Sequence, residues 1–84
     1  MELIVHFNTL PEGMALDQVK ADLAVLLDDD GWLTASGEDF IEIELEDERA
    51  NPKYGILTVR NYLQKARFAR DTTIELAGVA SEIY

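Results

Sequence analysis

Cysteine is absent from this chain of 84 residues, and histidine occurs once, at position 6. Without thiols the chain cannot form a disulfide, a zinc–thiolate centre or a cysteine nucleophile. No apolar run approaches the roughly 20 residues that a membrane-spanning helix needs, and residues 1–7 lack the basic region of a signal peptide. A chain of this length can bury one small core. We therefore expect residues 1–84 to form a single cytoplasmic domain without a membrane partner.

Basic residues are almost missing from the first half of the chain. Residues 1–48 hold 14 acidic residues and one basic residue, Lys20, whereas residues 49–70 hold six basic residues and no acidic one. The formal net charge is −10. The simpler interpretation is that the basic segment neutralises neighbouring carboxylates. The alternative is a basic surface that faces an anionic partner.

The clearest pattern lies between residues 39 and 47, where apolar residues alternate with glutamates. A period of two is typical of a strand with one buried and one solvated face. We expect this strand to be central in a sheet, with helices packed on its apolar side. Its glutamates should then point away from the helices; they are Glu42, Glu44 and Glu46.

The remaining elements follow from periodicity and from turn residues. Strands are predicted at 2–8, 32–35 and 72–77, and helices at 15–29 and from 52 to 67 or 68. Gly31 is expected to end the first helix in the left-handed region. Residues 78–84 are predicted to be a tail, either flexible or extended. The buried stripe of the first helix should comprise Leu16, Val19, Leu23 and Leu26, and that of the second Ile56, Val59, Leu63 and Ala66.

The resulting order, βαββαβ, resembles the ferredoxin-like (split βαβ) arrangement. The stretch Gly-Trp-Leu-Thr-Ala-Ser-Gly at 31–37, before an alternating strand, is similar to that of small bacterial ferredoxin-like proteins of unknown role. The resemblance covers residues 2–77. It implies an α+β two-layer sandwich, with a four-stranded antiparallel sheet and two helices on one face. It also leads us to expect the first and third strands at the centre, parallel to each other.

The other face of such a sheet has no cover from this chain. A one-residue slip in the hairpin would expose Leu33 and Ala35 there in place of Trp32 and Thr34. Apolar side chains clustered in an acidic field mark a contact surface. The residues expected on this face are Glu2, Ile4, His6, Trp32, Thr34, Phe40, Glu42, Glu44, Glu46, Thr73 and Glu75.

Several activities of ferredoxin-like proteins do not fit these residues. RNA-recognition modules need basic and stacking aromatic residues on the open face, where this chain has glutamates. Acylphosphatase-like members have an arginine in a glycine-rich loop after the first strand, and the loop at 9–13 has no base. Carriers of heavy metals need paired cysteines. We therefore expect neither nucleic acid nor a cofactor as a ligand.

Two further motifs give weak signals. Asp28-Asp29-Asp30-Gly31 resembles part of a calcium loop, but the alignment puts Leu26 and Gly37 at the first and last ligand positions. His6 could form a general-base dyad with Glu42 or Glu44, with Ser36 or Ser81 as the only candidate nucleophiles. A lone histidine beside carboxylates is more typical of a surface ion pair. We expect no metal site and no enzymatic activity.

The hypothesis that the residues favour is a non-enzymatic acidic protein-binding domain, for example an inhibitor or immunity-type partner of a basic protein. The alternative is a homodimeric regulatory domain that binds a small ligand at the subunit interface. A third candidate, anion binding by the helix from 52 to 68, is weakened by the net charge of −10. The predicted protein contacts are His6, Asp29, Asp30, Trp32, Phe40, Glu42 and Glu44.

Overall fold

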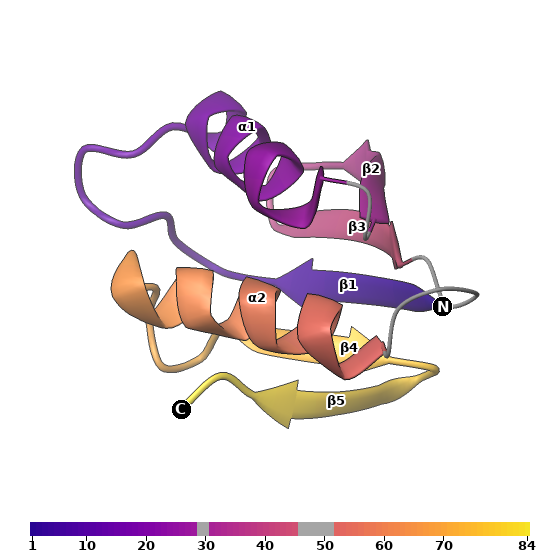
Figure 1. Ribbon diagram of the computed structural model, residues 1–84. Helices are drawn as coiled ribbons and strands as arrows, with labels where there is room; N and C mark the ends of the chain where they lie inside the picture. Colours follow the sequence, from indigo (N-terminus) through magenta and orange to yellow (C-terminus); the bar gives the residue numbers. More distant parts are fainter. Residues whose placement is uncertain (29–30, 46–51) are drawn as a thin grey trace.

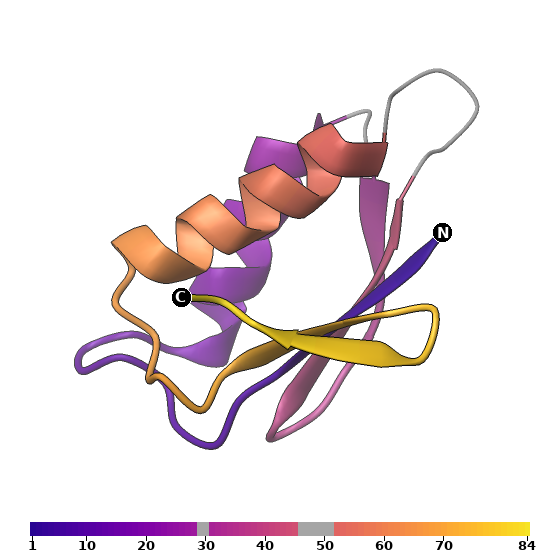
Figure 2. The ribbon, with the colours of Figure 1, turned by 90° about the horizontal axis from the view of Figure 1, so that it is seen from below.

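The computed structural model describes residues 1–28, 31–45 and 52–84 and shows an α+β fold. One antiparallel sheet has the strand order β2-β3-β1-β4-β5. Both helices cover the same face of this sheet, so the molecule has two layers (Figures 1 and 2). The elements in chain order are β1 (Glu2–His6), α1 (Leu16–Leu27), β2 (Gly31–Ser36), β3 (Phe40–Leu45), α2 (Pro52–Lys65), β4 (Thr73–Leu76) and β5 (Val79–Glu82).

The core lies between the helices and the two central strands, β1 and β3. Ile41 and Ile43 of β3 pair with Val5 and Leu3 of β1, and all four side chains are fully buried. Burial of such a side chain stabilises the fold by roughly 1.5–3 kcal/mol. The rings of Phe7 and Phe68 meet edge to face, with centroids 6.0 Å apart. The helices complete the core with Val19, Leu23, Leu27, Val59 and Leu63.

The orientation of the central pair differs from the prediction, because β1 and β3 are antiparallel. A helix joins β1 to β2, and the chain then reverses in the β2–β3 hairpin. β3 therefore runs opposite to β1, and the expectation of a parallel pair was wrong.

The number of strands also differs, since the sheet has five strands and not four. Ala77 and Gly78 both have positive φ, 50° and 84°, and form the two-residue turn between β4 and β5. Such turns match the twist of antiparallel strands. The segment predicted as a tail is thus extended along β4, and Ile83 after it is buried in the core.

The β2–β3 hairpin contains an irregularity that the sequence pattern did not predict. Trp32 lies opposite Glu44 and Ala35 opposite Glu42, and the register shifts between Leu33 and Ala35. Such a bulge interrupts the regular alternation of side chains between the two faces of the sheet. Trp32 and Ala35 therefore share the face of the glutamates, so neither of the two expected registers holds along the whole strand.

Gly31 was expected to end α1 in the left-handed region. It belongs instead to β2 and has no positive φ. A Cβ atom at Gly31 would lie 2.8 Å from the backbone oxygen of Glu44. Glycine is needed here because the backbones approach closely.

The buried stripe of α1 also requires a correction. Leu27 is buried, whereas the side chain of Leu26, which was expected in the core, is 48% exposed. Val19, Leu23 and Leu27 are spaced four residues apart and form one ridge against the sheet.

This correction can be tested with the same substitution at two adjacent positions. We expect Leu27→Ala to lower the free energy of unfolding by about 2–5 kcal/mol, because it leaves a cavity in the core. Leu26→Ala should change it by no more than about 0.5 kcal/mol. Urea denaturation of both variants measures the difference, and equal losses would contradict this position of α1.

Candidate functional site: an acidic sheet face

The face of the sheet opposite the helices has no cover from any described element (Figure 2). We call it the open face. Its membership follows from the cross-strand register and the alternation of side chains along each strand. Its residues are Glu2, Ile4, His6, Trp32, Ala35, Phe40, Glu42, Glu44, Thr73, Glu75, Ala80 and Glu82.

Carboxylates meet at the centre of the open face. Glu2 of β1 lies opposite Glu44 of β3. Ile4 lies between Glu42 on one side and Glu75 on the other. Antiparallel pairing thus brings acidic side chains from three strands around one isoleucine.

Glu2 shows the electrostatic consequence of this crowding. The pKa of Glu2 is raised, chiefly by a hydrogen bond with Glu42 and by the charge of Glu42. Burial and the charges of Glu44 and Glu75 raise this pKa further. A like charge nearby disfavours the ionised form of a carboxyl group. Glu2 therefore binds a proton more readily than an isolated glutamate would.

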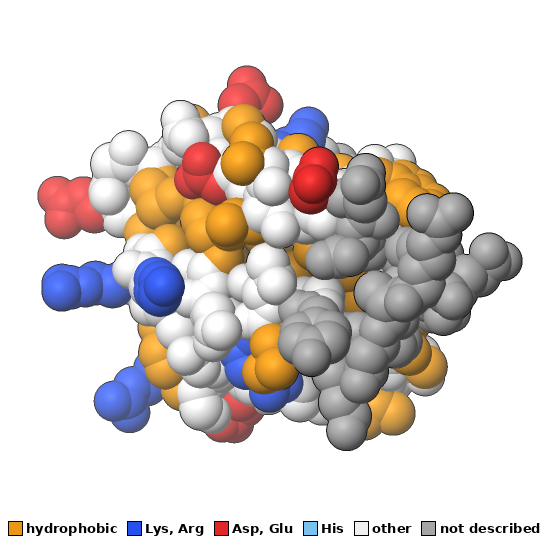
Figure 3. All heavy atoms as spheres, in the orientation of Figure 1, with side chains coloured by type: hydrophobic (Ala, Val, Ile, Leu, Met, Phe, Trp, Pro, Cys, Tyr) orange, Lys and Arg blue, Asp and Glu red, His pale blue; other side chains and the backbone are white. Residues whose placement is uncertain are grey.

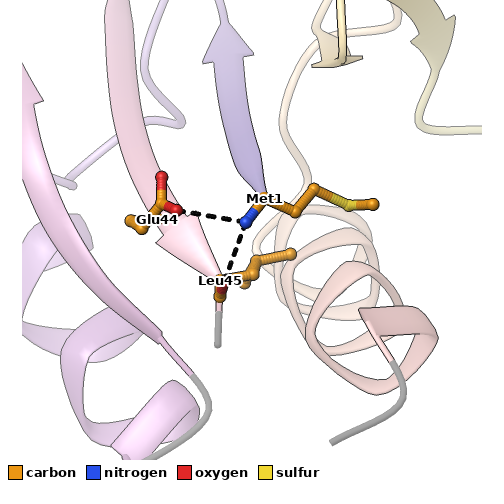
Figure 4. A network of polar contacts seen from close by, with 3 residues as sticks. All are labelled: Met1, Glu44 and Leu45. Carbon is orange, nitrogen blue, oxygen red and sulfur yellow. Dashed lines mark hydrogen bonds and ion pairs between the residues drawn. The ribbon is translucent and has the colours of Figure 1, made fainter. Parts of the chain in front are cut away.

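The terminal amino group and the single imidazole contact the margins of this cluster. The α-amino group of Met1 donates hydrogen bonds to Glu44 Oε1 at 3.1 Å and to the Leu45 carbonyl at 3.0 Å (Figure 4). His6 Nε2 lies 3.4 Å from Glu75 Oε1. Among the described side chains, which exclude those of residues 29–30 and 46–54, no lysine or arginine forms an ion pair with the open face. The negative charge of the face is therefore only partly compensated.

Apolar side chains lie among the carboxylates. Trp32 is 51% exposed, and Ile4 and Phe40 are half-buried. The Phe40 ring lies against Gly37, where an added Cβ would come within 2.4 Å of it. The face can thus offer both charge and contact area to a partner.

Most of the predicted contact residues come together on this face. His6, Trp32, Phe40, Glu42 and Glu44 all belong to it. Asp29, Asp30 and Glu46 lie outside the described residues, so their predicted positions stay predictions.

Sequence reasoning missed three members of the face. Ala80 and Glu82 belong to β5, which was not predicted as a strand. The signal was the Ala77–Gly78 pair, a two-residue turn between short runs of strand-forming residues. Ala35 was expected on this face only if the hairpin had the alternative register. The bulge places it on the same face as Trp32.

The expected pairing of His6 with Glu42 or Glu44 is corrected by the structure, since its ion-pair partner is Glu75. Ser36 lies opposite Ile41 and Ser81 opposite Ile74, which are both buried on the helix side. The sheet thus separates both serines from His6.

The described part of the basic segment, α2 and the residues after it up to Arg70, lies on the helix side of the sheet. Arg60 of α2 donates from Nη2 to Ser81 Oγ at 3.4 Å, and the side chain of Lys53 is outside the description. Figure 3 shows this side, where Lys and Arg as well as Asp and Glu side chains surround hydrophobic ones. Among the described side chains no lysine or arginine forms an ion pair with a carboxylate. Arg49 and the side chain of Lys53 lie outside the description, so neutralisation of neighbouring carboxylates by the basic segment stays a prediction.

Tyr62 of α2 connects the two helices through a hydrogen bond to α1. Its hydroxyl donates to Asp22 Oδ2 at 2.8 Å. Burial raises the pKa of Tyr62, and the carboxylate of Asp22 raises it further. The tyrosine therefore stays protonated and fixes α2 against α1.

Two hollows are present outside the central cluster. One, of about 170 Å³, lies at the end of β1, where Asn8 donates to Asp71 Oδ2 at 2.7 Å. The other, of about 490 Å³, lies between α1 and β2. In the described part of the chain, no group of three or more His, Asp or Glu side chains is arranged to hold a metal ion.

Comparison with protein-family models, with curated proteins and with solved structures finds no significant match to this chain. Neither helix has the length and apolarity required to cross a bilayer, as far as the described residues show.

The crowding at Glu2 predicts how stability depends on pH. Because the pKa of Glu2 is raised in the folded state above its ordinary value of 4.5, the folded state binds this proton more tightly than the unfolded state. The resulting stabilisation is complete below pH 4.5 and is lost as the pH rises through the folded-state pKa. Glu2→Gln should therefore raise Tm at pH 7, and this gain should shrink as the pH falls towards 4.5.

Thermal unfolding followed by circular dichroism at several pH values measures this effect. Glu12→Gln, at an exposed carboxylate in the loop after β1, controls for the general benefit of lowering the net negative charge. A gain for Glu2→Gln that equals the control, or that does not vary with pH, would contradict the proposed crowding.

Proposed function

We propose that this protein is a non-enzymatic, cytoplasmic protein-binding domain of the ferredoxin-like type, whose open face docks a basic protein. An inhibitor or immunity-type partner of a basic toxin or nuclease is the concrete form of this proposal. The observation that carries it is the cluster of Glu2, Glu42, Glu44 and Glu75 around Ile4, which no described lysine or arginine side chain contacts as an ion pair.

The electrostatics support a partner of opposite charge. Carboxylates that repel one another in the free protein gain from a lysine or arginine placed between them. A surface of a single sign also accelerates encounter with a basic protein and disfavours acidic ones.

The apolar members of the face support a protein rather than a small ion as the ligand. Trp32 is half exposed, and Phe40 and Ile4 are partly accessible beside the carboxylates. Aromatic side chains are frequent anchors at the centres of protein interfaces. Charge would thus orient the partner, and these side chains would hold it.

Two features of the structure argue against catalysis as the role of the face. His6 contacts Glu75, and both candidate serine nucleophiles lie on the opposite side of the sheet. A general base must reach the proton that it removes, within hydrogen-bond distance or through one water molecule.

The alternative function is a homodimer that binds a small ligand between its open faces. A twofold axis at this face would bring two copies of Glu42 and Glu44 together. Juxtaposed like charges cost several kcal/mol. Sedimentation analysis distinguishes the two functions, and we expect a monomer at all concentrations up to about 100 µM, well above typical affinities of stable dimers.

Charge reversal tests the proposed docking surface. We expect the double variant Glu42→Lys/Glu44→Lys to lose the basic protein that the wild-type chain captures from its native cell, identified by mass spectrometry. In a titration with that purified protein, affinity should fall at least tenfold, which corresponds to about 1.4 kcal/mol.

Glu12→Lys/Asp17→Lys is the matched control, because it changes the net charge equally at exposed positions away from the open face. Circular dichroism verifies that both variants are folded. Undiminished affinity of the Glu42→Lys/Glu44→Lys variant, or an equal loss in the control, would exclude the open face as the docking surface.

A further inference from the structure

The groove of about 490 Å³ between α1 and β2 is a second surface with features of a binding site. Its helix wall consists of Ala21 and Ala24, whose small, exposed side chains leave room in front of the strand. Its strand wall is formed by Trp32 and Leu33 of β2. Lys20 and Asp28 lie at its two ends.

β2 is the exposed edge of the sheet on this side. Among the described residues β2 pairs with β3 alone, so the backbone groups on its outer side have no strand partner. Edge strands are usually protected by lysine, proline or a bulge. The segment Gly-Trp-Leu-Thr-Ala-Ser has neither a charge nor a proline, and its bulge lies beyond Leu33. Residues 31–33 are therefore a regular, unprotected edge.

The groove and the free strand edge lie side by side. A strand edge next to a helix wall suits the addition of an extended peptide, which hydrogen-bonds to the edge and places alternate side chains in the groove.

The charges at the two ends define the occupant. Lys20 and Asp28 are eight residues apart, which is about 12 Å along a helix. An extended chain covers this distance with about four residues at roughly 3.3 Å each. A segment with a cationic residue near Asp28 and an apolar residue facing Ala24 complements these positions, and the net charge of −10 disfavours an acidic segment.

We propose that β2 accepts an extended, basic segment of a partner protein as an additional strand, with an apolar side chain seated between Ala24 and Leu33. This site lies at the edge of the sheet, shares only Trp32 with the open face and does not depend on the function proposed for that face. A second copy of the chain is the less favourable occupant, because two molecules of the same strong negative charge repel each other.

The probes are two peptides with acetylated and amidated ends, Lys-Val-Thr-Val-Thr-Val and Val-Thr-Val-Thr-Val-Lys. They differ in which end carries the cation, so the tighter one reveals the direction of the added strand. Trp32 is the only tryptophan of the chain, and its fluorescence therefore reports binding at β2. We expect a saturable fluorescence change, with NMR shifts confined to β2 and the facing side of α1.

Peptides methylated at alternate backbone amides test whether the contact is strand addition. One of the two methylation patterns removes the donors that face β2, and it should weaken binding at least tenfold. This corresponds to the loss of two hydrogen bonds of about 0.5–1.5 kcal/mol each. Equal affinity of both methylated peptides and the parent would overturn the proposal, as would the absence of a saturable change.

Substitutions on α1 supply the matched pair. Ala24→Gln fills the groove and should weaken peptide binding at least tenfold, whereas Val25→Gln, one residue along the same exposed surface, should not. Glu42→Lys on the open face should leave peptide binding within about twofold, so failure of this site and failure of the open face are distinguishable. A dimer in sedimentation whose contacts map to β2 would show that a second copy occupies the edge, and this would also overturn the proposal.

Discussion

Burial of one face of the β1–β3 pair is the constraint on which the other features depend. Leu3 and Val5 pair with Ile43 and Ile41 beneath the helices, and all are excluded from solvent. Because side chains alternate along a strand, this burial forces the residues between them onto the opposite side. The acidic open face is thus a geometric consequence of the core, and a change of register by one residue would invert both.

The antiparallel arrangement turns separate glutamates into a cluster. Glu42 and Glu44 lie two residues apart on β3, whereas Glu2 is far from them in the sequence. The pairing of β1 with β3 brings all three together. The hydrogen bond with Glu42 and the charge of Glu42 raise the pKa of Glu2, so this proximity disfavours the ionised form of Glu2. The free protein therefore retains repulsion between glutamates on a face that does not contribute to the hydrophobic core. This repulsion is the physical basis for proposing a cationic partner.

The two edge strands of the sheet, β5 and β2, have different surroundings. On one side β5 extends the sheet, and Ile83 after it returns to the core. On the other side the uncharged strand β2 lies beside the small residues of α1. A folded partner on the open face and an extended segment at β2 would use different forces, charge in the first case and backbone hydrogen bonds in the second.

The sequence by itself determined the two helices, the alternating burial of β3 and the side to which Glu42 and Glu44 point, because these depend on local periodicity. The tertiary structure alone decided the antiparallel central pair, the bulge that places Ala35 beside the glutamates, and the choice of Leu27 over Leu26 for the core. These features depend on contacts between distant segments: the path of the chain through the hairpin, the close approach of Gly31 to Glu44, and the rotation of α1 against the sheet. Periodicity shows which residues share a face, but only packing shows which neighbouring strand or helix that face meets.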